Sequence, residues 1–142
     1  MSVFVVDASV VLKWFLPEVH SEAARKLLDA SHQYVAPDLL FPEVGNAVWK
    51  KMRRGEVSRE DAGVLVRDIA AIAVETIAAR ILFEDACAIA LASGQTVYDA
   101  TYLALAVRLE TRLVTGDERL ERTTAAIPEL AEYICAVEAF PS

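Results

Sequence analysis

Short apolar runs alternate with longer helical patterns along the chain. The apolar runs lie at Val3–Val6, Tyr34–Ala36, Ile72–Ile77, Arg112–Thr115 and Tyr133–Val137. They are rich in β-branched residues, and several are closed by Asp, Pro or Gly, which is typical of buried strands. Because these runs are continuous rather than alternating, they predict strands that are covered on both faces.

Helical patterns fill the gaps between these runs. They predict helices over Ala8–Phe15, Ser21–Ala30, Asp38–Arg54, a segment opened by Ser58, Ala79–Ala92 and Asp99–Glu110. Asp38 is the expected N-cap of its helix, with Pro42 tolerated in the first turn. Ser58 and Asp61 have capping-box spacing. This alternation predicts an α/β fold in a single domain over residues 1–142, with a mostly parallel sheet of about five strands.

Charge and cysteine usage narrow the classes of function. The formal net charge of −7 argues against a nonspecific nucleic-acid coat or a membrane-surface binder. It does not argue against a nuclease, because each bound divalent cation returns two positive charges locally. Cys87 and Cys135 lack metal-ligand spacing and are expected to be small buried residues in a reducing cytosol. No apolar stretch approaches the roughly 20 residues of a membrane span, so we expect a soluble cytoplasmic protein.

Four acidic residues lie where an α/β fold brings distant segments together. Asp7 follows the first predicted strand, and Asp117 follows the fourth. Glu43 lies in the first turns of the helix after the second strand, and Asp99 opens the helix that leads into the fourth. Ligands of open α/β sheets bind beyond the carboxyl ends of the strands, at a topological switch point. The sequence therefore predicts that the four carboxylates converge at one sheet edge.

Each acid also has a local structural explanation. Asp7 could cap the first helix, Asp99 could complete a capping box with Thr96, Asp117 could serve a turn, and Glu43 could be a solvated charge. A cluster is harder to explain in this way, because two carboxylates about 4 Å apart repel by about 4 kcal/mol at an effective dielectric constant near 20. Four together need a cation. Oxygen ligands without Cys or His suit Mg²⁺ or Mn²⁺ rather than zinc.

Three polar neighbours are candidates for supporting this site. Ser9 can place a hydroxyl at the same edge, Asn46 shares the helical face of Glu43, and Thr115 lies two residues before Asp117. Each could instead be a local cap or a solvated side chain. The helix that carries Glu43 ends in four cations, which either stabilise the helix C-terminus or guide an RNA backbone: Lys50, Lys51, Arg53 and Arg54.

Four segments resemble the motifs of PIN domains. They are Val5–Val10, Pro42–Ala47, Thr96–Ala106 and Leu113–Leu120, and their acids are separated by 36, 56 and 18 residues. The compact members of this family are mostly VapC-type toxins of toxin–antitoxin pairs. The resemblance implies a three-layer α/β/α sandwich and Mg²⁺- or Mn²⁺-dependent endoribonuclease activity.

The resemblance also assigns roles and partners. Asp7, Asp99 and Asp117 are the expected metal ligands, while Glu43 either ligates directly or orients the attacking water as a general base. The substrate would be RNA, and a small antitoxin would inhibit the enzyme. The net charge favours a basic segment in that antitoxin, and the apolar share of 55% predicts a homodimer. The alternative is a PIN-fold binding module that sequesters RNA or a protein partner without cleavage.

Overall fold

The fold is built on a five-stranded sheet in which every pair of neighbouring strands is parallel. In the computed structural model, which describes residues 2–29 and 31–140, the strand order is β3-β2-β1-β4-β5. The strands are β1 (Val3–Val6), β2 (Gln33–Pro37), β3 (Val74–Ile77), β4 (Leu113–Thr115) and β5 (Ile134–Ala136). The predicted α/β class and the predicted number of strands are confirmed.

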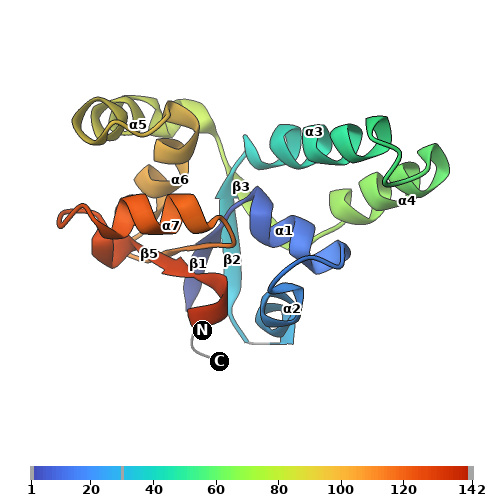
Figure 1. Cartoon of the computed structure of the whole chain (residues 1–142). Helices are drawn as coiled ribbons and strands as arrows, with labels where there is room; N and C mark the ends of the chain where they lie inside the picture. Colours follow the sequence, from blue (N-terminus) through green and yellow to red (C-terminus); the bar gives the residue numbers. More distant parts are fainter. Residues whose placement is uncertain (1, 30, 141–142) are drawn as a thin grey trace.

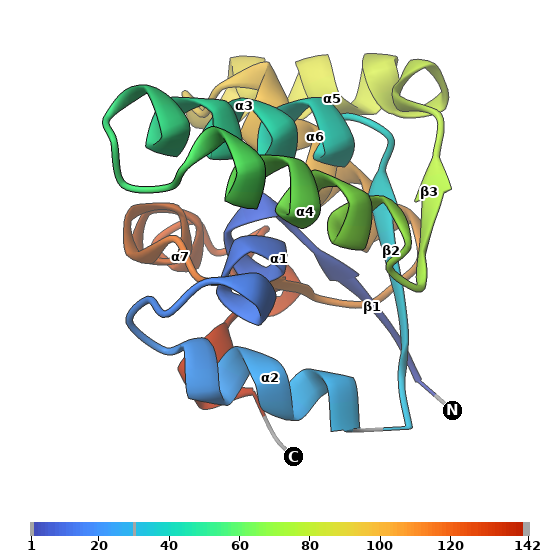
Figure 2. The same ribbon diagram turned by 90° about the vertical axis from the view of Figure 1, so that its right-hand side faces the viewer.

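Helices cover both faces of this sheet. They are α1 (Ala8–Phe15), α2 (Ser21–Asp29), α3 (Leu40–Arg53), α4 (Arg59–Ala70), α5 (Ala79–Ser93), α6 (Val97–Arg108) and α7 (Glu118–Ala125), with short 3₁₀ turns at Ala131–Tyr133 and Val137–Ala139. Figure 1 shows α1 to α4 on one side of the sheet and α5 to α7 on the other, and Figure 2 shows α3 and α4 running above α1 and α2. The three-layer arrangement implied by the resemblance is therefore present.

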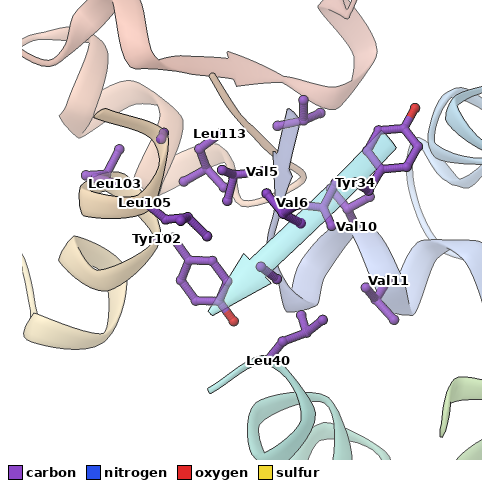
Figure 3. Packing of buried hydrophobic residues seen from close by; sticks show 14 of the residues in the cluster. Val5, Val6, Val10, Val11, Tyr34, Leu40, Tyr102, Leu103, Leu105 and Leu113 are labelled. Carbon is purple, nitrogen blue, oxygen red and sulfur yellow. The ribbon is translucent and has the colours of Figure 1, made fainter. Parts of the chain in front are cut away.

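The deepest packing is between the central strands and α6. All seven residues from 100 to 106 are buried, because α6 contacts the sheet on one side and α5 on another. Figure 3 shows Leu103 and Leu105 of this helix beside Val5 and Leu113 of the sheet. A helix enclosed in this way shows little amphipathicity, which explains why its apolar residues are not confined to one stripe.

Strand β3 departs from the expectation of strands covered on both faces. It lies at the edge of the sheet, and Glu75 and Thr76 in its middle are exposed. It also begins at Val74 rather than at Ile72. The amide of Ile72 donates to Ile69 O at 3.2 Å, so this residue lies in the turn that follows α4. This turn takes residues that the apolar pattern had assigned to the strand.

Two helix starts differ from the sequence-based prediction. Asp38 is not the N-cap of α3, which begins at Leu40 without a side-chain cap. Instead, Asp38 Oδ1 accepts a hydrogen bond from the amide of Ala79 at 3.0 Å, because β2 and β3 end side by side. Helix α6 begins at Val97 rather than Asp99, with Thr96 as its N-cap.

Other local predictions are confirmed, and one helix was missed. Ser58 caps α4, accepting from the amide of Asp61 at 3.0 Å. The predicted helix from Ser21 is present through Asp29, and its last residue, Ala30, lies outside the described residues. Helix α7 was not predicted, because its polar sequence buries only Leu120 and Thr124. Within the described residues, no helix is both long and apolar enough to cross a membrane.

Candidate functional site

The four acids lie at the carboxyl edge of the sheet, around the ends of β1 and β4. The chain places β2 and then β3 on one side of β1, and β4 and then β5 on the other. The topological switch point therefore lies between β1 and β4. Asp7 directly follows β1, and Asp117 lies two residues beyond the end of β4.

Asp7 is the most buried of the four, with 6% of its surface exposed. Its Oδ1 accepts hydrogen bonds from the Ser9 hydroxyl at 2.5 Å and from the Val10 amide at 3.2 Å. Its Oδ2 accepts a hydrogen bond from the Thr115 hydroxyl. The pKa of Asp7 is raised to about 6, because burial and, to a smaller extent, the charge of Asp117 outweigh these hydrogen bonds, which favour the ionised form.

Ser9 and Thr115 link Asp7 to the turn after β4. The amide of Gly116 donates to Ser9 Oγ at 2.8 Å, and the amide of Asp117 donates to Thr115 Oγ1 at 3.0 Å. Two of the three residues expected to support the site therefore lie in one hydrogen-bond network with Asp7. The third, Asn46, is exposed on α3 and makes no side-chain hydrogen bond within the described part of the chain.

Lys13 borders this network and was missed by the sequence analysis. A Cβ atom at Gly116 would lie 2.3 Å from Lys13 Cε, so the lysine stem occupies the space that only glycine leaves open. Lys13 is 8% exposed, and its Nζ donates to Val19 O at 2.7 Å. A single cation within the apolar run Val10–Phe15 was the signal in the sequence, because lysine is rarely buried without partners.

Glu43 reaches the site from α3 and is bound by a residue of α6. The hydroxyl of Tyr102, which is 2% exposed, donates to Glu43 Oε1 at 2.6 Å. Burial raises the pKa of Glu43, and the charge of Asp99 adds to this effect. Burial and the neighbouring carboxylates also raise the pKa of Tyr102, which stays a protonated donor. Its position, three residues after Asp99 on the same helix, was the signal that could have identified it.

Asp99 and Asp117 complete the cluster. Burial and the charge of Asp117 raise the pKa of Asp99, while Arg119, with its Nη2 3.6 Å from Asp99 Oδ2, lowers it. Asp117 is also the N-cap of α7, accepting from the Leu120 amide at 3.0 Å. Like-charge repulsion thus connects Asp7 with Asp117, Asp117 with Asp99, and Asp99 with Glu43.

The chemistry of this donor set suits a hard divalent cation. All the charged groups that could ligate a metal here are carboxylates. Burial and mutual repulsion oppose the ionisation of three of them, Asp7, Glu43 and Asp99. A bound Mg²⁺ or Mn²⁺ would offset both effects. Among residues 2–29 and 31–140, however, no group of three or more His, Cys, Asp or Glu side chains is already arranged to hold an ion.

Most of the cations that end α3 have partners nearby. Lys51 Nζ lies 3.5 Å from Glu18 Oε2, and Arg54 Nη1 lies 4.0 Å from Glu56 Oε2. The guanidinium of Arg53 stacks over Trp49 at 5.2 Å from the ring centroid. These contacts favour the structural explanation of the basic helix end over guidance of an RNA backbone.

Comparisons with known proteins identify the family of this chain. The sequence matches the PIN domain family model over residues 4–126. Ribonuclease VapC3 of Pyrobaculum aerophilum is 35% identical over 127 residues, which is 87% of this chain and 95% of that protein. The crystal structure of PAE2754 from Pyrobaculum aerophilum has a TM-score of 0.67 at 26% identity and covers 97% of this chain and 93% of its own. The resemblance seen in the four acidic motifs is confirmed, and the chain belongs to the PIN-domain family.

Proposed function

We propose that this protein is a divalent-metal-dependent endoribonuclease that hydrolyses phosphodiester bonds in RNA and acts as a VapC-type toxin. The observation that carries the proposal is the convergence of Asp7, Glu43, Asp99 and Asp117 at the switch point of the sheet, with raised pKa values for three of the four. Membership of the PIN-domain family and the similarity to a protein named as a ribonuclease support RNA as the substrate.

Asp7, Asp99 and Asp117 are proposed as the metal ligands. A bound Mg²⁺ or Mn²⁺ would polarise the scissile phosphate and acidify the attacking water. Both carboxylate oxygens of Asp7 already accept hydrogen bonds from hydroxyl groups, and hydroxyl groups can rotate. Ser9 and Thr115 would therefore keep Asp7 oriented in the metal-free state. When a metal binds, one of the two hydroxyls would rotate away and leave a lone pair of the Asp7 carboxylate free for the metal. Glu43 is the candidate either for a further ligand or for the base that orients the water.

The partners follow from charge and from exposed apolar surface. We propose an antitoxin with a basic segment, because a cation beside the carboxylates relieves the same repulsion as a metal does. Arg119 of this chain already lies in such a position next to Asp99.

We also propose a homodimer, because Ile81 and Phe83 of α5 and Tyr98 of α6 are between 57% and 64% exposed. Light scattering at micromolar concentration checks the dimer, and a monomeric mass would contradict it.

RNA cleavage by the purified protein tests the proposed activity. We expect cleavage with Mg²⁺ or Mn²⁺, none in excess EDTA, and at least a hundredfold loss in Asp7→Asn and Asp99→Asn. Asp68→Asn, which changes an exposed acid on α4, is the matched control and should cleave at the wild-type rate. Full activity in EDTA would exclude the metal mechanism. Metal-independent RNA binding without cleavage would identify a binding module instead.

A further inference from the structure

We propose that Tyr102 is a positioning residue of this site, holding the Glu43 carboxylate in place beside Asp99. The inference deepens the proposed function and rests on it. The contact joins two helices that are far apart in sequence, since the hydroxyl on α6 donates to Glu43 Oε1 on α3 at 2.6 Å. This length lies at the short end of the range for a hydroxyl–oxygen hydrogen bond.

The donor is rigid because its ring belongs to the core. Tyr102 is only 2% exposed and lies within the seven buried residues of α6. Figure 3 shows the ring below Leu105, with its oxygen directed toward Leu40 at the start of α3. A ring packed at the density of a protein interior has a fixed orientation, so the position of its hydroxyl is set by the fold.

Glu43 needs such a partner more than Asp7 and Asp117 do. Asp7 and Asp117 are each held by a backbone amide of the helix that they cap. Glu43 lies in the first turn of α3, and within the described residues its side chain has Tyr102 as its one hydrogen-bond partner. A long carboxylate side chain that ligates or activates water must be confined to one rotamer, and a hydrogen bond from a rigid neighbour achieves this. The hydrogen bond from Tyr102 occupies Oε1 of Glu43 and leaves Oε2 available to ligate a metal or to orient the attacking water.

Tyr34 is a control for this role, because it is a buried tyrosine whose hydroxyl donates a hydrogen bond outside the acidic cluster. Tyr34 is 6% exposed and donates to the backbone carbonyl of Leu27 at 2.7 Å. In Figure 3 its hydroxyl points away from that of Tyr102. The two tyrosines thus share burial and hydrogen-bond length, and they differ in whether the acceptor belongs to the acidic cluster.

The experiment compares Tyr102→Phe with Tyr34→Phe, using Mn²⁺ alone as the probe. Each variant loses one hydroxyl and keeps its ring. Thermal melts over a Mn²⁺ titration give the Mn²⁺ dissociation constant, because stabilisation grows with the logarithm of the metal concentration divided by that constant. We expect Tyr102→Phe to raise this dissociation constant by about tenfold, the usual size of the effect for a residue that orients a ligand. Tyr34→Phe should lower the metal-free melting temperature without changing the Mn²⁺ dissociation constant.

A double variant tests whether Tyr102 acts through Glu43. In a Glu43→Gln background the carboxylate is gone, so adding Tyr102→Phe should not change the Mn²⁺ dissociation constant any further. Asp7→Asn reports on the site itself. If wild type responds to Mn²⁺, Asp7→Asn does not, and Tyr102→Phe titrates like wild type, the role of Tyr102 is refuted while the proposed function stands. If wild type itself is insensitive to Mn²⁺, the proposed metal site and this inference both fail.

Discussion

Asp7 shows how one residue serves both the fold and the site. It caps α1 through the amide of Val10, and it also accepts hydrogen bonds from two hydroxyls at the sheet edge. The structural and the functional explanations of this acid are therefore compatible. Its burial has a cost, because an ionised carboxylate with 6% exposure loses most of its hydration.

This cost should be visible as a pH dependence of stability. An unfolded Asp7 ionises near pH 3.8, whereas the folded protein retains the proton until about pH 6. Between these values the folded state binds more protons, so the free energy of unfolding falls as the pH rises through this range, and above it the contribution is constant. The loss should be on the order of 3 kcal/mol.

Urea unfolding in EDTA between pH 4 and pH 7 measures this effect. Asp7→Asn should fall less steeply with pH than wild type, since the asparagine does not titrate. Glu43 and Asp99 have pKa values raised in the same direction and are retained in both proteins, so the difference between the two curves isolates Asp7. Parallel curves would show that Asp7 ionises normally in the folded state.

At the scale of elements, helix starts and the candidate site coincide. Asp7, Thr96 and Asp117 are the N-caps of α1, α6 and α7, and each lies next to or within an acidic motif. Parallel strands end at one edge of the sheet, where the next helices begin, so capping residues and ligands compete for the same positions. The sequence analysis treated capping and membership of the acidic cluster as alternatives, but in the structure Asp7 and Asp117 cap helices and also lie in the cluster.

Asp38 offers a test of how two such elements are joined. Its side chain accepts from the first amide of α5 rather than from α3. Asp38→Ala should lower stability by about 1 kcal/mol, the usual cost of losing a capping acceptor, and the melting temperature by roughly 4 °C. Asp38→Asn keeps an acceptor and should lose less than half of this. Unchanged melting of the alanine variant would show that this contact adds nothing.

For the whole molecule, the gathering of charges should couple metal binding to global stability. A ligand that binds only the native state at about a hundredfold over its dissociation constant adds roughly 2.7 kcal/mol. For a domain of this size, that is a rise in melting temperature on the order of 10 °C with Mg²⁺. If the acids were isolated caps, Mg²⁺ would leave the melting temperature unchanged.

Asp99→Asn sharpens this test. The Asp99 side chain is not a cap, because its backbone amide, rather than its carboxylate, bonds to Thr96. Burial and the charge of Asp117 disfavour its ionised form. The variant should therefore melt at or above the wild type without metal and gain much less from Mg²⁺. A full Mg²⁺ response in Asp99→Asn would remove this residue from the ligand set.

The sequence by itself determined the fold class, the parallel sheet and the four acids. Buried strands and helices leave different apolar periods, and the carboxyl ends of parallel strands share one edge, so placing Asp7 and Asp117 needed only the order of the elements. It also identified the Ser58 cap, because a capping box is a local interaction.

Only the tertiary structure decided which side chains meet across that edge. The partners of Glu43 and Asp38 lie 59 and 41 residues away in sequence. The side chain that packs against Gly116 is that of Lys13, from α1, which connects β1 to β2. Such contacts depend on the packing of α1, α3, α5 and α6, and no local pattern encodes them. For the same reason, the sequence did not show where the turn after α4 ends and β3 begins, because both lie in the single apolar run Ile72–Ile77. It also did not show that β3 is an exposed edge strand.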